Sequence, residues 1–162
     1  GHVAGDKVLQ QVASILKDAG RLTDSVVRWG GEEFLLIARN TGPDSAPVLA
    51  RRIRQAFKRH IFEVADGVKL QLTCSMGWAC YPFIPSDCGV LGWEEVVGVA
   101  DKALYAAKNS GRDSWVGLIS TAKTPEDYLY KLIRADVPGL LSAGELDALA
   151  SIDELSEITW ES

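Results

Sequence analysis

The segment from Arg28 to Phe34 carries the residues best suited to chemistry in this 162-residue sequence. It reads Arg-Trp-Gly-Gly-Glu-Glu-Phe, so two glycines are followed at once by the adjacent carboxylates Glu32 and Glu33. Glycine lets a phosphate approach backbone N–H groups closely, and carboxylates hold the Mg²⁺ that neutralises charge during phosphoryl transfer. The segment therefore indicates a site for a magnesium-bound triphosphate. The alternative is an ordinary exposed hairpin with Gly-Gly and Glu-Glu at its turn.

The elements around this segment are predicted from the spacing of apolar residues. Residues 25–28 and 34–38 favour strands, and the Gly-Gly pair between them can supply the positive backbone angles of a tight hairpin. Apolar side chains recur at helical spacing from Asp6 to about Ala19, with Asp6 at the expected helix start, and again over residues 45–59. The hairpin is thus expected to connect two amphipathic helices.

The second half of the sequence continues this alternation of elements. Apolar and polar residues alternate strictly over residues 68–76, which predicts a half-buried strand that runs on to residue 81. Helical spacing returns over residues 94–108, and residues 115–119 can form a closing strand. Because helices alternate with strands and one adjacent pair forms a hairpin, the predicted fold class is α/β (α+β), a mixed central β-sheet flanked by helices.

Composition and charge restrict the partners. The chain is 47% hydrophobic with a net charge of −5, and it has no apolar run near the roughly 20 residues of a membrane-spanning helix. This charge argues against binding to DNA or RNA, which depends on neutralising backbone phosphates. Three cysteines without a C-x-x-C pair or a His cluster are expected to be free thiols in a reducing compartment.

The last part of the chain, residues 119–162, differs in character. It holds three Lys and Arg residues against nine Asp and Glu. A capped start at Thr124 and capping-box spacings that begin at Ser142 and Ser151 predict short helices. We expect a small helical appendage or a linker.

Five motifs occur in an order and spacing that resemble those of one known family. They are GH-x-x-GD at residues 1–6, GGEEF at 30–34, T-x-S-x-G at 73–77, AD-x-ALY at 100–105 and AK-x-x-GR at 107–112. Together they resemble the GGDEF family of diguanylate cyclases, in its GGEEF variant, over residues 1 to about 116. The resemblance implies a nucleotidyl-cyclase-like GGDEF domain over residues 1–118, followed by an acidic helical tail or linker over residues 119–162.

The resemblance assigns the catalytic roles to the Gly-Gly-Glu-Glu segment. Glu32 would bind Mg²⁺ or Mn²⁺ and help to deprotonate the attacking 3′-hydroxyl, and Glu33 would add a further metal or site carboxylate. Gly30 and Gly31 would face the phosphates.

Four residues elsewhere would contact the nucleotide by the same resemblance. Asp6 would accept the N–H donors of guanine, with His2 close by in the pattern. Lys108 and Arg112 would donate charge-assisted hydrogen bonds to triphosphate oxygens from positions one helical turn apart. Taken by itself, Asp6 fits a helix cap equally well, and Lys108 and Arg112 fit a solvated helix end.

A further element concerns control. Arg21 and Asp24 form an Arg-x-x-Asp pattern upstream of the glycines, at the separation seen in the family's product-binding inhibitory site, and Arg52 aligns with its second arginine. Guanidinium groups can contact phosphate and guanine acceptors, while a carboxylate can take guanine N–H donors. The trio is predicted to bind cyclic di-GMP and inhibit the enzyme. The alternative is a set of ordinary surface salt bridges.

The sequence departs from the family pattern at its N-terminus. In the family an earlier strand supplies a metal-binding Asp, and the helix after it supplies an Asn near the nucleotide; a strand and a helix need about 30 residues. Gly1 leaves no room for them, so we expect an N-terminally truncated domain whose own catalysis is in question for want of that Asp.

The activity that the resemblance implies is the condensation of two GTP molecules into cyclic di-GMP, a bacterial second messenger, with release of pyrophosphate. Two domains would meet as a homodimer, controlled by an upstream sensor or receiver domain, in the cytoplasm, with any membrane anchor in missing upstream segments. One rival is a catalytically idle domain that serves as a cyclic di-GMP receptor. A second is a structural role in which a partner strand completes the sheet.

Overall fold

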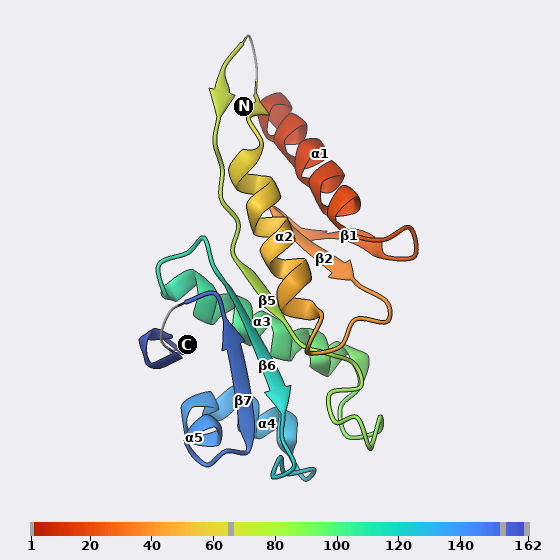
Figure 1. Ribbon diagram of the computed structural model, residues 1–162, viewed down its shortest axis with the longest axis vertical. Helices are drawn as coiled ribbons and strands as arrows, with labels where there is room; N and C mark the ends of the chain where they lie inside the picture. Colours follow the sequence, from red (N-terminus) through yellow and green to blue (C-terminus); the bar gives the residue numbers. More distant parts are fainter. Residues whose placement is uncertain (1, 65–66, 153–154, 161–162) are drawn as a thin grey trace. The chain divides into compact units, whose positions relative to one another are not determined.

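The computed structural model describes residues 2–64, 67–152 and 155–160 (Figure 1). The chain divides into two compact units, Gly1–Thr41 with Val48–Cys74 and Gly42–Pro47 with Ser75–Ser162, and each is described by itself. In the described ranges no helix combines the length and the apolar character needed to cross a membrane.

The first unit holds the predicted hairpin and the helices on either side of it in sequence. Its elements are α1 (His2–Ala19), β1 (Ser25–Gly30), β2 (Glu33–Ile37), α2 (Ala46–Arg59), β3 (Phe62–Glu63) and β4 (Lys69–Leu70). Strands β1 and β2 pair antiparallel from Ser25 opposite Ile37 to Gly30 opposite Glu33. Helix α1 contacts β1 and β3.

The apolar faces of both helices in this unit are buried, as their spacing predicted. They contribute Ile15, Leu16 and Ala19 from α1 and Ala50, Ile53 and Phe57 from α2. Phe62 of β3 is fully buried and lies 5.9 Å from Phe57, ring centroid to ring centroid. Gln11 of α1 also donates to the Glu63 carbonyl at 3.0 Å and accepts from the Glu63 N–H at 3.2 Å, which ties α1 to β3.

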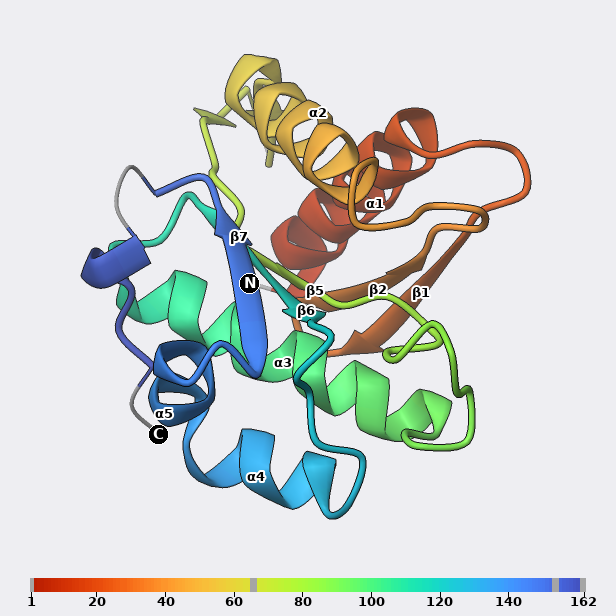
Figure 2. The same ribbon diagram turned by 60° about the horizontal axis from the view of Figure 1, so that its bottom comes forward.

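The second unit is built on a three-stranded mixed sheet (Figure 2). Its elements are β5 (Met76–Trp78), α3 (Trp93–Asn109), β6 (Trp115–Ser120), α4 (Leu129–Ala135), α5 (Val137–Ser142), β7 (Leu146–Ala150) and the 3₁₀ turn η1 (Leu155–Glu157). Strand β6 pairs parallel with β5 and antiparallel with β7. Helix α3 packs along β5 and β6, α5 packs against β7, and α4 contacts both helices.

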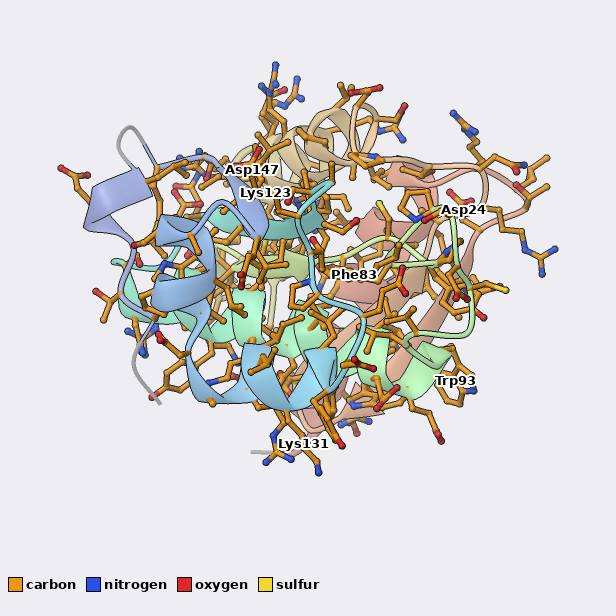
Figure 3. The ribbon with its side chains drawn as sticks, turned by 90° about the horizontal axis from the view of Figure 1, so that it is seen from below. Asp24, Phe83, Trp93, Lys123, Lys131 and Asp147 are labelled. Atoms are coloured by element: carbon orange, nitrogen blue, oxygen red, sulfur yellow. The ribbon has the colours of Figure 1, made fainter. Side chains whose placement is uncertain are left out.

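The core of this unit includes the C-terminal segment. Phe83, labelled in Figure 3, and Val99 of α3 share one buried cluster with Leu129, Ile133 and Leu146 from the last third of the chain. The acidic segment therefore contributes apolar side chains to the same core as α3.

The fold class and most elements agree with the sequence predictions, with five differences. The helix expected from Thr124 begins at Leu129. The helix expected from Asp6 begins at His2. Of the long strand expected over residues 68–81, only β4 and β5 form, because a strand needs a neighbouring strand along its length; in the described part of the chain residues 71–75 belong to no sheet. Strand β6 is central rather than closing, because β7 pairs with its other edge.

The fifth difference concerns the residues after Ser142. The capping-box spacing there suggested a helix, but residues 146–150 form β7, in which Leu146 and Ala148 are buried while Asp147 and Leu149 are exposed. This alternation of period two suits a strand with one buried face. Of the second expected helix start, at Ser151 and Glu154, Glu154 lies outside the described residues; Ser151 makes a pair of hydrogen bonds with Trp115 of β6.

Candidate active site

The hairpin tip is a two-residue turn made by Gly31 and Glu32. Gly31 has φ +50°, whereas Glu32 does not have a positive φ, the pattern of a type II′ turn with glycine first. Gly30 is the last residue of β1 and Glu33 the first of β2. All four residues are exposed, and a Cβ atom added to either glycine would have no neighbour within 4 Å. Space beside the turn is therefore open on the side of both glycines.

The carboxylates at this tip fit one class of metal ion. In residues 2–64, 67–152 and 155–160 no three His, Cys, Asp or Glu side chains gather as a metal cluster, so a closed site of four protein ligands, as zinc takes in structural sites, is not formed there. Magnesium instead binds one or two carboxylates together with waters and substrate phosphates. The oxygen donors of Glu32 and Glu33, exposed beside open glycines, fit that kind of ion.

The candidate guanine-binding residues lie on α1. Asp6 is exposed and stands one turn inside the helix, so it does not cap the helix start. The side chain of His2 lies outside the described part of the chain.

The candidate triphosphate-binding residues lie in the second unit, at the end of α3. Lys108 is in the last helical turn, whereas the helix ends at Asn109 and Arg112 follows it with φ +62°. The two residues are therefore not one helical turn apart, which corrects the prediction. The Arg112 N–H donates to the Ala107 carbonyl at 3.2 Å. A positive φ is uncommon outside glycine, so this segment holds its arginine in a specific backbone conformation.

Asp24 organises the loop between α1 and β1 (Figure 3). Its carboxylate accepts hydrogen bonds from the N–H of Arg21 at 2.7 Å and from the N–H of Arg39 at 3.0 Å. The pKa of Asp24 is lowered, mainly by the hydrogen bond from the backbone N–H of Arg21. Burial opposes this shift, while the backbone N–H of Arg39 and the charges of Arg21 and Arg52 add smaller lowering contributions. The structure therefore brings the charges of Arg21, Asp24 and Arg52 within electrostatic reach of one another.

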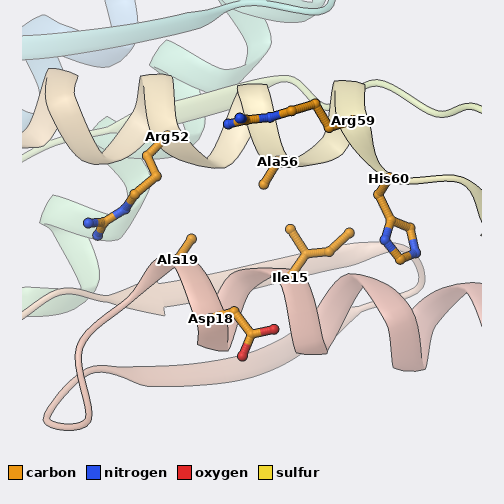
Figure 4. A pocket seen from close by; sticks show the side chains of 7 residues that line it. All are labelled: Ile15, Asp18, Ala19, Arg52, Ala56, Arg59 and His60. Carbon is orange, nitrogen blue, oxygen red and sulfur yellow. The ribbon is translucent and has the colours of Figure 1, made fainter.

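Arg52 also lines a groove between α1 and α2 of about 320 Å³ (Figure 4). Ile15, Ala19 and Ala56 supply its apolar surface. Its polar lining is Asp18, Arg52, Arg59 and His60. Asp18 and Arg59 have no role assigned from the sequence, although the spacing of Arg52, Ala56 and Arg59 places the three on one face of α2.

A further residue without a role assigned from the sequence is Arg28, the first residue of the segment that runs from Arg28 to Phe34. Its Nε and Nη2 atoms donate to the Gly31 carbonyl at 3.0 and 2.8 Å. A contact of this kind cannot be read from the spacing of residue types, because it depends on how the turn folds back.

Comparison with known proteins identifies the family of this chain. Residues 1–114 match the family described as diguanylate cyclase, GGDEF domain. Diguanylate cyclase A of Treponema denticola is 39% identical over 113 residues, which are 70% of this chain and 29% of that protein. Diguanylate cyclase DosC of Escherichia coli K12 is 32% identical over 113 residues, 70% of this chain and 23% of that protein.

A solved structure shows the same similarity. It is a delta-N mutant of TpbB (YfiN) from Pseudomonas aeruginosa comprising only the GGDEF domain, with a TM-score of 0.56 and 27% identity over 70% of this chain and 63% of that one. The chain spans about a quarter of the length of the two curated relatives. By the match over residues 1–114, this chain belongs to the GGDEF domain family.

Proposed function

We propose that this domain, in its natural protein, acts as a diguanylate cyclase that joins two GTP molecules into cyclic di-GMP. The observation that carries the proposal is the exposed turn that presents Glu32 and Glu33 beside two glycines with open space around them. Relatives that are named diguanylate cyclases support it. The Gly-Gly pair gives phosphate oxygens access to backbone N–H groups, and the two carboxylates give a metal-bound nucleotide its protein ligands.

In the proposed reaction each 3′-hydroxyl attacks the α-phosphorus of the other GTP. A 3′-oxygen–phosphorus bond forms, the bond from the α-phosphorus to the bridging oxygen breaks, and pyrophosphate leaves with that electron pair. Glu32 takes the hydroxyl proton. Mg²⁺ or Mn²⁺, when held by Glu32 and Glu33, supplies positive charge for the phosphate oxygens.

The remaining nucleotide contacts are part of the same proposal. Asp6, exposed on α1, accepts from the N–H donors of guanine, and Lys108 and Arg112 donate to the triphosphate. Because each nucleotide must be attacked by the other, two copies of the domain pair during the reaction. A sensor or receiver domain in the same protein would control that pairing in the cytoplasm.

The test is to incubate the protein at its natural length with Mg²⁺ and GTP and to measure cyclic di-GMP by chromatography and mass spectrometry. Glu32→Ala should lower turnover by at least about 100-fold, because it removes both a metal ligand and the proton acceptor. Glu126→Ala, which removes an exposed carboxylate of the second unit, serves as the control. Equal turnover in Glu32→Ala and the wild type would overturn the role of Glu32.

We further propose that Arg21, Asp24 and Arg52 bind the product and inhibit the enzyme. The surroundings of Asp24 support this. Its carboxylate accepts from the backbone N–H of Arg21, which is the main cause of its lowered pKa, and the charges of Arg21 and Arg52 act on the same carboxylate. The Asp24 oxygens that accept from Arg21 and Arg39 retain further lone pairs, so the carboxylate can also accept from a ligand.

Titration calorimetry with cyclic di-GMP tests the inhibitory site. Arg21→Ala and Arg52→Ala should each weaken binding by roughly 10- to 150-fold, the equivalent of a charge-assisted hydrogen bond of about 1.5–3 kcal/mol. Arg51→Ala, at the neighbouring exposed position of α2, is the matched control. Unchanged affinity in both arginine variants would refute the site. Binding of cyclic di-GMP by a protein that makes none would support the receptor function instead.

A further inference from the structure

The Arg28 side chain folds back onto the tip of its own hairpin. Two of its nitrogens, Nε and Nη2, donate to the same acceptor, the Gly31 carbonyl oxygen, at 3.0 and 2.8 Å. A carbonyl oxygen has two lone pairs, and hydrogen bonds from a charged donor are roughly twice as strong as neutral ones. The contact therefore holds the orientation of one specific carbonyl group.

This carbonyl belongs to the peptide that leads into Glu32. A peptide unit is planar and trans, so its C=O and N–H groups point in opposite directions. The hydrogen bonds that hold the Gly31 carbonyl toward Arg28 therefore direct the Glu32 N–H away from Arg28. They also fix the plane of the Gly31–Glu32 peptide. Without such a contact the plane could turn easily, because Gly31 has no Cβ, adopts φ +50° and has open space beside it.

The strand register explains how Arg28 reaches the turn. Arg28 lies opposite Phe34 and Gly30 opposite Glu33, so β1 carries one more residue than β2 over this step, and that extra residue is Trp29. A bulge of this kind bends the strand and redirects neighbouring side chains. Trp29 itself is 55% exposed. The bulge at Trp29 and the Arg28 side chain together determine the conformation of the hairpin tip.

We propose that Arg28 is a positioning residue that holds the Gly31–Glu32 peptide in the orientation the nucleotide requires. The kinetic part of this inference rests on the proposed cyclase function, and the structural part does not. Arg28 would act through the peptide, without contact to the substrate. Residues that orient the ligands of a metal site typically change metal affinity or activity by about 10- to 100-fold when they are replaced, and Glu32 is the proposed metal ligand here.

Arg28→Gln and Arg28→Lys test the proposal with two readouts. The first is the ¹⁵N order parameter of the Gly31 and Glu32 amides in the protein without nucleotide, which is near 0.85 for rigid backbone and below about 0.6 for flexible backbone. Both variants should fall from the rigid to the flexible range, because neither side chain carries the forked donors of a guanidinium. Arg51→Gln, on the exposed face of α2, should keep the wild-type values.

The second readout is the kinetics of cyclic di-GMP formation by the natural-length protein. Both variants should lower kcat by about 10- to 100-fold and leave KM within about twofold. Unchanged order parameters would overturn the proposal. A large rise in KM in Arg28→Gln, with a wild-type KM in Arg28→Lys, would also overturn the proposal, because it would mean that Arg28 binds the nucleotide by its charge. A wild type that makes no product would refute the cyclase function, while the order parameters would still decide whether Arg28 holds the peptide.

Discussion

Replacing Gly77 with alanine gives a direct test of how α3 packs on the sheet. A Cβ atom at this position would lie 2.1 Å from the Ala100 carbonyl oxygen and 2.1 Å from the Leu104 amide nitrogen. These are the two atoms that an α-helix joins by its i to i+4 hydrogen bond. The new methyl group would meet helix backbone, which cannot rotate aside as a side chain can.

The cost can be judged from the contacts that must open. Cβ atoms essentially never lie within 3.0 Å of such neighbours, so α3 must move away from β5 by about 1 Å or more. The side chains of Val99, Ala103 and Ala106 on this helix are fully buried and would lose contacts. Overpacking of this kind costs typically 1–3 kcal/mol, and we expect about 3 kcal/mol because the clash is with backbone.

Urea unfolding followed by circular dichroism measures this loss. With a slope of about 1–3 kcal/mol per molar urea, the midpoint should fall by about 1–3 M. Gly5→Ala is the control, since this glycine is inside α1 and a Cβ there has no neighbour within 4 Å; it should stabilise the protein by about 0.5–1 kcal/mol. A Gly77→Ala midpoint within about 0.3 M of the wild type would refute the packing argument.

Three further predictions follow from the described contacts. Asp24→Asn should destabilise the protein at pH 7, because a carboxyl group with a lowered pKa adds stability while it is ionised in the native state. The difference in stability between variant and wild type should therefore shrink as the pH falls below 3.8. Urea midpoints that differ from the wild type by the same amount at pH 7, 5 and 3 would contradict this. Truncation after Ser120 should abolish cooperative thermal unfolding of the second unit, because the burial of Leu129 and Ile133 alone contributes about 1.5–3 kcal/mol of stability each. An unchanged calorimetric transition would argue against this. At neutral pH iodoacetamide should modify exposed Cys88 before Cys80, whose thiol pKa is raised by burial; peptide mass spectrometry showing the reverse order would be evidence against this.

The sequence alone predicted the parts of the site that depend on local chemistry. Two glycines between β-favouring runs predict a hairpin because only a few turn types connect two strands so tightly, and Gly31 does take the positive φ that such a turn requires. The apolar faces of α1 and α2 were likewise predicted from helical spacing. On α3 that spacing indicated Val97, Ala100 and Leu104, which are only half-buried, whereas the buried face is offset by one residue to Val96, Val99 and Ala103. The roles of Glu32, Asp6 and Lys108 came from a resemblance to the family and stay predictions for this chain.

Tertiary structure decided what depends on partners distant in the chain. Residues 71–75 have the alternating pattern of a strand, yet only β4 and β5 form on either side of them, where β3 and β6 pair with them. Strand β7 forms because the edge of β6 is available to residues 146–150, although local spacing there suggested a helix. Likewise, the sequence shows that position 77 is glycine, but only the packed fold shows that the helix backbone occupies the space of its missing Cβ. Turn chemistry acts over a few neighbouring residues, whereas pairing and close packing depend on which distant segments meet.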